Sequence, residues 1–225
     1  SFPLCILKQF IIQENMELKI STNPQDYLEC LKNMENKVNQ IIENKSDELV
    51  WMLNHPAIYT SGSKDNKDDL LDSQSFPVIK TNRGGKYTYH GPGQRVVYLM
   101  LNLNNRTKDI KKFVSSIESI IINTLKTFNI EGISLTKHHG VFVKKIDNKY
   151  YKIASIGLKF KKWVTYHGFS ININPNLSHY KGIRPCGLDS EYVTSFHDLG
   201  FDIDIEDFDD ILVKNIFDTF NELHT

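Results

Sequence analysis

The chain has 225 residues and a balanced charge, with 27 Lys and Arg side chains against 27 Asp and Glu. That balance excludes a general attraction to nucleic acid or to an anionic membrane, and no run approaches the roughly 18 apolar residues of a membrane span. With 40% hydrophobic and 24% charged residues and no signal peptide or internal repeat, we expect a cytoplasmic protein with a single domain over residues 1–225, without a nucleic-acid or membrane partner.

The first half of the chain predicts two strands and a helix. Residues 4–12 form an apolar run typical of a strand. Asn23 and Pro24 resemble a helix start, with a capping side chain followed by proline. Apolar residues then recur at three- and four-residue spacing as one buried helix face, at Tyr27, Leu28, Leu31, Met34, Val38, Ile41 and Ile42. A buried strand is expected over residues 48–53, and a mobile polar surface segment over residues 63–75.

The second half predicts further strands and two more amphipathic helices. Brief strands are expected at residues 76–80 and 95–103, followed by a helix over residues 109–128. Asp147 and Asn148 separate two apolar runs and predict a hairpin, after which a strand over residues 163–174 and a helix over residues 206–223 complete the chain. Hairpin-linked strands outnumber helices, so we expect an α+β fold with a mixed or antiparallel sheet and packed helices.

Glycines and aromatic residues gather between residues 81 and 103. Gly84, Gly85, Gly91 and Gly93 lie within ten positions, interleaved with Tyr87, Tyr89, His90 and an arginine. Glycine pairs let a backbone approach a ligand closely, while the rings supply flat walls and hydrogen-bonding groups. The pattern favours a ligand-gripping segment and a decorated hairpin about equally.

The three cysteines differ in their surroundings. Cys5, Cys30 and Cys186 are odd in number and widely spaced, which argues against a disulfide framework and a thiolate metal site. Cys5 and Cys30 lie in apolar patterns typical of packed thiols. Cys186 lies between Pro185 and Gly187, flanks that suit a nucleophile.

A cysteine nucleophile needs a neighbouring base or cation, because a free thiol is only a few per cent thiolate at neutral pH. Besides the histidines, Lys152 is a candidate, since it begins the apolar run Lys-Ile-Ala-Ser-Ile-Gly. A buried ammonium there must be paired or have a lowered pKa, and such a lysine can pass protons in acyl transfer. The alternative is that Lys152 extends to solvent at the hairpin end, which spacing alone favours.

Four ordered motifs resemble one known family. They begin at Arg83 (Arg-Gly-Gly-Lys-Tyr-Thr-Tyr-His-Gly-Pro-Gly-Gln), Lys152 (Lys-Ile-Ala-Ser-Ile-Gly), His167 (His-Gly-Phe-Ser-Ile-Asn) and Pro185 (Pro-Cys-Gly). Together with the upstream His55-Pro56, they are similar to the signature blocks of the lipoyl(octanoyl) transferases of lipoate biosynthesis. The resemblance implies the catalytic fold of biotin and lipoate ligases. It also implies transfer of an octanoyl group to a lysine of a lipoyl domain through a cysteine thioester.

The resemblance also assigns roles to residues and partners. It implies Cys186 as nucleophile and Lys152 as acid/base partner, with no metal and no cofactor. The donor would be octanoyl-acyl carrier protein, and the acceptors would be the lipoyl domains of 2-oxoacid dehydrogenase complexes and the glycine cleavage H protein. The residues implied to line the acyl site are Arg83, Gly84, Gly85, Lys86, Tyr87, Thr88, Tyr89, His90, Ser155, Ile156, Gly157, Gly168, Phe169 and Ser170.

Several positions depart from the family pattern, including His138 and His139, which precede Gly140 where the family usually has a proline-containing entry. The family usually has glutamine where Lys86 stands and commonly an acidic residue where Asn54 stands. An added cation at Lys86 could alter docking of the carrier protein or face solvent.

Two other functions share part of the pattern: an ATP-dependent lipoate ligase, which needs no cysteine nucleophile, and a non-catalytic protein that binds lipoyl domains or acyl carriers. The Pro-Cys-Gly motif favours the transferase over the ligase, and retention of both Cys186 and Lys152 argues against the binding protein.

Overall fold

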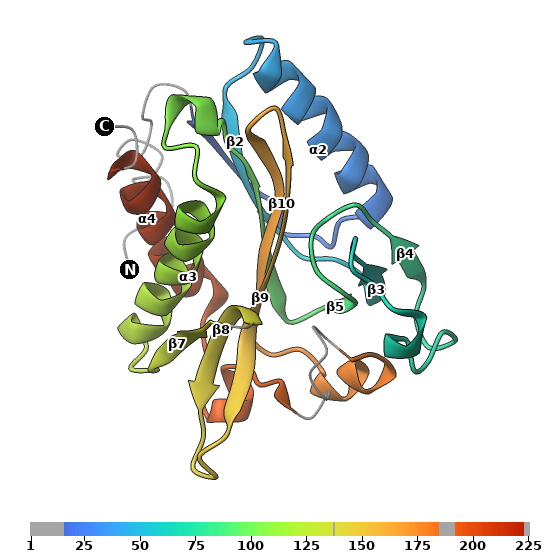
Figure 1. The fold of residues 1–225 in the computed structure, drawn as a ribbon. Helices are drawn as coiled ribbons and strands as arrows, with labels where there is room; N and C mark the ends of the chain where they lie inside the picture. The colour runs from blue at the N-terminus through green and yellow to red at the C-terminus, as the bar shows by residue number, and fades with distance from the viewer. Residues whose placement is uncertain (1–15, 137, 185–191, 223–225) are drawn as a thin grey trace.

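The computed structural model describes residues 16–136, 138–184 and 192–222 (Figure 1). Seven strands form one sheet in the order β1-β2-β6-β10-β9-β8-β7, and a second sheet has the order β4-β3-β5. The strands are β1 (Met16–Ile20), β2 (Glu48–Leu53), β3 (Ile58–Ser61), β4 (Val78–Lys80), β5 (Thr88–His90), β6 (Gln94–Met100), β7 (Gly132–Leu135), β8 (His138–Lys144), β9 (Tyr150–Lys161) and β10 (Val164–Asn172). Each sheet contains one parallel pair, β1 with β2 and β3 with β4, so the predicted α+β fold with a mixed sheet is confirmed.

Helices cover both faces of the large sheet. The helix α2 (Tyr27–Ile42) lies on one face, while α3 (Ile110–Thr127) and α4 (Ile205–Glu222) lie together on the other (Figure 1). The alternation of β6 explains both layers, because Val96, Tyr98 and Met100 pack with α2 while Val97 and Leu99 pack with α3 and α4. No helix among the described residues is long and apolar enough to cross a membrane.

The helix α2 begins later than Asn23 and Pro24 predict. The amide of Gln25 donates to the carbonyl of Asn54 at 2.8 Å, which holds the chain against the end of β2. The helix then begins at Tyr27, with the side chain of Asp26 accepting the amide of Glu29 at 2.9 Å. Leu28 was expected on the buried face, but it is 58% exposed, because the buried stripe of the helix runs through Tyr27, Cys30, Met34, Val38 and Ile41 and Leu28 lies outside it.

For the remaining elements, the predicted type of secondary structure agrees with the structure better than the predicted number and bounds of the strands. The hairpin of β8 and β9 turns at Asp147-Asn148, where Asn148 has a φ of 61°. Strands β1, β3, β5 and β7 were not predicted, and the strand predicted at residues 4–12 lies outside the described residues. Segment 63–75 is not wholly solvated, because Asp69 is buried in a short 3₁₀ helix and the next residue, Leu70, forms an isolated bridge with Ile183.

Candidate active site

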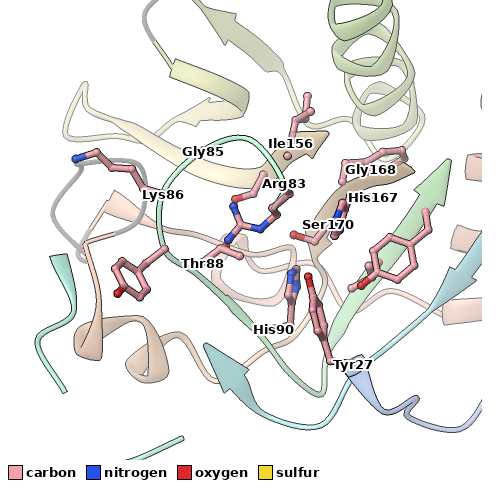
Figure 2. A pocket seen from close by; sticks show the side chains of 16 residues that line it. Tyr27, Arg83, Gly85, Lys86, Thr88, His90, Ile156, His167, Gly168 and Ser170 are labelled. Carbon is pink, nitrogen blue, oxygen red and sulfur yellow. The ribbon is translucent and has the colours of Figure 1, made fainter. Parts of the chain in front are cut away.

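A pocket lies where the small sheet meets the large one (Figure 2). About 470 Å³ of space, open solvent included, lies between and above the residues that line it. Its walls come from the first residue of α2, the loop before β5, and strands β5, β6, β9 and β10. The lining residues are Tyr27, Arg83, Gly85, Lys86, Tyr87, Thr88, His90, Val96, Tyr98, Ser155, Ile156, Gly157, His167, Gly168, Phe169 and Ser170.

The fold brings twelve of the fourteen predicted acyl-site residues into this lining, although they come from three separate motifs. Gly84 and Tyr89 are absent from it. Successive side chains of a strand point to opposite faces, so Thr88 and His90 face the pocket while Tyr89 packs in the aromatic cluster behind β5. There the hydroxyl of Tyr89 lies 2.8 Å from Nδ1 of His179. Tyr89 therefore supports the pocket wall from outside.

Arg83 is buried beside the pocket and anchors the loop that precedes β5 (Figure 2). Its guanidinium donates to the carbonyl and hydroxyl oxygens of Thr60 at 2.9 and 2.8 Å, and to the carbonyl of Gly84 at 3.0 Å. Gly85 follows with a φ of 93°, a left-handed conformation that favours glycine. These bonds fix the loop against β3 and give the pocket a built wall.

Strand β10 forms a wall of the pocket, and the close approach of its backbone to β6 determines the shape of that wall. A Cβ atom at Gly168 would lie 2.0 Å from the carbonyl oxygen of Val97, so glycine is needed for the close pairing of β10 with β6. His167 has a φ of 59°, which interrupts the regular alternation of the strand, and its ring lines the pocket beside that of Tyr166. Ser170 and Phe169 complete this wall.

Three buried histidines gather at the pocket. Burial lowers the pKa of His55 to about 4 and that of His167 to about 3, with the Arg83 charge adding to the effect at His167. Burial also lowers the pKa of His90 well below its usual value. Nδ1 of His55 lies 2.6 Å from the carbonyl of Gln25, so it donates, and Nε2 accepts the hydroxyl of Tyr98 at 2.7 Å. The pocket thus contains neutral imidazoles.

These histidines predict a loss of stability in mild acid. The unfolded chain takes up protons near pH 6.5, whereas folded His55 stays neutral until about pH 4, so stability falls as the pH drops below 6.5. At pH 5 we expect a loss of about 2 kcal/mol from His55. Urea unfolding at pH 7 and pH 5 measures it. His55→Gln should reduce the difference, with His197→Gln, at an exposed histidine, as control; an unchanged difference in His55→Gln would contradict the assignment.

Lys152 is buried rather than extended to solvent. Its exposed fraction is 1%, so the interpretation that it snorkels at the hairpin end is wrong. Its Nζ lies 5.5 Å from the ring centroid of Phe142, and a Cβ atom at Gly140 would come within 2.9 Å of its Cε. Lys152 is not among the pocket-lining residues. Its side chain is buried on β9, three positions before Ser155, which does line the pocket.

Cys186 lies outside the described residues, but the chain on both sides of it is described. Ile183 forms a bridge with Leu70, and Val193 forms a parallel bridge with Lys152. The amide of Thr194 also donates to the carbonyl of Lys152 at 2.9 Å. Burial raises the pKa of the Cys30 thiol to about 12, which makes this cysteine unreactive.

Comparisons with known proteins match these features. The model of the lipoyl protein ligase A/B catalytic domain matches residues 26–217. The chain belongs to this family. It is 48% identical to an octanoyltransferase of Wolbachia pipientis wMel, covering 91% of this chain and 99% of that protein. It is 45% identical to an octanoyltransferase of Parvibaculum lavamentivorans, covering 92% and 93%. The predicted resemblance to the lipoyl(octanoyl) transferases is thereby confirmed.

Solved structures of this family and of biotin ligases share the fold. A bi-partite lipoate protein ligase of Thermoplasma acidophilum aligns with a TM-score of 0.69 at 12% identity, over 93% of this chain and 85% of that one. A biotin protein ligase of Aquifex aeolicus aligns with a TM-score of 0.55 at 12% identity, over 93% and 72%. The predicted ligase-like fold is confirmed by these alignments.

Some pocket residues escaped prediction. Tyr27 was assigned to the helix core, and Val96 and Tyr98 to a buried strand; only the packing of α2 against the sheet reveals their second role. His167 stood in a family motif without a proposed role. Among the described residues, no cluster of three or more His, Cys, Asp and Glu side chains is arranged to hold a metal ion.

Two of the departures from the family pattern, Lys86 and Asn54, have defined surroundings. Nζ of Lys86 donates to Oδ2 of Asp69 at 2.8 Å, so its charge is paired. Oδ1 of Asn54 is buried without a hydrogen-bond partner among the described residues, and the backbone carbonyl of Asn54 accepts the amide of Gln25.

Proposed function

We propose that this chain transfers an octanoyl group from octanoyl-acyl carrier protein to a lysine of lipoyl domains, through a thioester on Cys186. The observation that carries the proposal is the convergence of three family motifs on one pocket, in a chain whose relatives at 48% and 45% identity are octanoyltransferases. The acceptors would be the lipoyl domains of 2-oxoacid dehydrogenase complexes and the glycine cleavage H protein, and the reaction would take place in the cytoplasm.

The pocket would hold the acyl chain. Val96 and the ring of Tyr98 supply apolar surface on the α2 face of the sheet, whereas the side chains of Ile156 and Phe169 pack in the core on the α3 and α4 face. Each methylene buried in the pocket contributes about 0.8 kcal/mol, so loss of one methylene weakens binding only several-fold. Selectivity against shorter chains is therefore moderate in this proposal.

The chemistry would proceed in two acyl transfers. Lys152 takes the proton of the Cys186 thiol, and the thiolate attacks the carbonyl carbon of the donor thioester. Collapse of the tetrahedral intermediate expels the carrier thiolate, which takes that proton and leaves as the thiol. The neutral amine of the acceptor lysine then attacks the acyl-enzyme, the Cys186 thiolate leaves, and the proton released from the nitrogen restores the enzyme. Backbone N–H groups near Cys186 or in the glycine-rich loop that begins at Arg83 would stabilise the oxyanion.

Mass spectrometry of the intact protein tests the proposal. Mixed with octanoyl-acyl carrier protein in the absence of ATP, the protein should gain the mass of one octanoyl group. Cys186→Ala should abolish the gain, and Cys30→Ala, at the buried thiol, should retain it. Addition of a lipoyl domain should discharge the acyl-enzyme and acylate one lysine of that domain.

The same experiment separates the alternatives. A lipoate ligase would leave the protein unmodified by the octanoyl carrier and would need ATP and magnesium to acylate the lipoyl domain. A non-catalytic binding protein would do neither. Either result would contradict the proposed transferase.

A further inference from the structure

Lys86 stands at the rim of the pocket with its ammonium directed away from Arg83 (Figure 2). Nζ donates to Oδ2 of Asp69 at 2.8 Å, where the lysine side chain is 34% exposed and the carboxylate side chain 8% exposed. The ammonium thus binds a nearly buried carboxylate. This ion pair connects the loop that lines the pocket to the short 3₁₀ helix at residues 67–69.

The backbone around Asp69 runs against the segment that leads toward Cys186. The carbonyl of Asp69 accepts the amide of Arg184 at 2.8 Å. The amides of Leu71 and Asp72 both donate to the carbonyl of Gly182, at 2.8 and 3.0 Å. With the bridge between Leu70 and Ile183, these bonds hold the chain up to two residues before Cys186.

The loop that carries Lys86 is fixed at its other side. The amide of Gly84 donates to the carbonyl of Leu158 on β9 at 2.8 Å, and the amide of Lys64 donates to the carbonyl of Gly85 at 3.0 Å. A Cβ atom at Gly62 would lie 2.2 Å from the carbonyl oxygen of Gly85, so the two loops are in close contact. Lys86 therefore extends from a rigid base.

We propose that the Lys86–Asp69 ion pair is a positioning pair, which sets the location of residues 182–184 relative to the acyl pocket. The proposal rests on the proposed function, because residues 182–184 lead directly into the Pro-Cys-Gly motif. Where the family pattern has a neutral glutamine, this chain uses a charge-assisted bond to a nearly buried carboxylate. In this proposal the pair acts through the backbone of Asp69 and not on the reacting atoms themselves.

The test uses the full chain and a small donor, octanoyl-pantetheine, which has no carrier protein to dock. Lys86→Met and Asp69→Asn should each slow acyl-enzyme formation about three- to fivefold in kcat with KM unchanged, because a partly exposed ion pair contributes modestly. The double variant should be no slower than either single variant, since both remove one interaction. Lys86→Gln should recover part of the rate, because its amide can donate to Asp69.

Lys45→Met, at a fully exposed ion pair with Glu43, is the matched control and should leave the rate unchanged. Additive losses in the double variant would overturn the proposal, as would a Lys86→Met defect confined to KM for the acyl carrier protein, which would assign Lys86 to carrier docking. Should Asp69→Asn not fold, the comparison of Lys86→Met with Lys86→Gln decides alone. Failure of the unmodified chain to form an acyl-enzyme would refute the proposed function; normal rates in the variants would refute this inference only.

Discussion

Replacement of Lys152 by methionine is expected to slow acyl-enzyme formation about 100-fold or more, since positioned acid–base groups contribute at least that much. The change removes the ammonium and keeps the length of the side chain, which fills a site that is 1% exposed. Methionine keeps the length of the lysine stem and adapts its shape to a packed site, so the protein should remain folded. Rapid-quench measurement of octanoyl transfer from the carrier protein, together with calorimetry, measures both effects.

Lys144→Met is the matched control, because Lys144 lies on the neighbouring strand β8 with an exposed side chain. It should transfer at the unmodified rate. A normal rate in Lys152→Met would remove Lys152 from the chemistry and leave it as a buried side chain of the sheet. A slow rate accompanied by a large fall in melting temperature would instead indicate a packing role.

Asp209→Ala is expected to destabilise the protein by about 3 to 5 kcal/mol, the cost of leaving one member of a buried ion pair alone. Nε and one Nη of Arg95 donate to the two carboxylate oxygens of Asp209 at 2.8 and 2.6 Å. Both residues are buried, 6% and 5% exposed, so water cannot replace the lost partner. The pair joins β6 to α4. Urea unfolding measures the loss.

The double variant Arg95→Met with Asp209→Leu should recover most of that stability, because it removes both charges and fills the space with apolar groups. Asp218→Ala, which breaks the exposed i,i+4 pair with Lys214 on the same helix, should have little effect. A single variant Asp209→Ala as stable as Asp218→Ala would show that the buried pair does not hold α4 in place.

The periodicity of apolar residues was sufficient to predict the long helices. The expected helices at residues 109–128 and 206–223 correspond closely to α3 and α4, because each has an apolar face repeated over several turns. The small sheet was predicted only in part: the strand expected at residues 76–80 contains β4, whereas β3 and β5, with four and three residues, are too short to show a period. The start of α2 depends on the bond between Gln25 and Asn54, which the sequence does not reveal.

Motifs predicted most of the pocket lining, and strand geometry explains the exceptions. Tyr89 lies within a family motif, yet its side chain faces away from the pocket. Side chains alternate along a strand, and its neighbours Thr88 and His90 face the pocket. Tyr27 lines the pocket only because α2 packs against a part of the sheet that is distant in the sequence. The burial of Lys152 could not be predicted from residue spacing either, because a lysine at this position of a hairpin can also extend its ammonium to solvent.

The bridges at Ile183 and Val193 have a consequence for the entropy of the chain between them. Closing a loop costs conformational entropy that rises with its length, and that cost is met when the two ends are brought into the fold. Here both ends are already paired, to Leu70 and to Lys152. The fold itself therefore meets the cost of bringing these two ends together, and an acyl donor does not have to supply it.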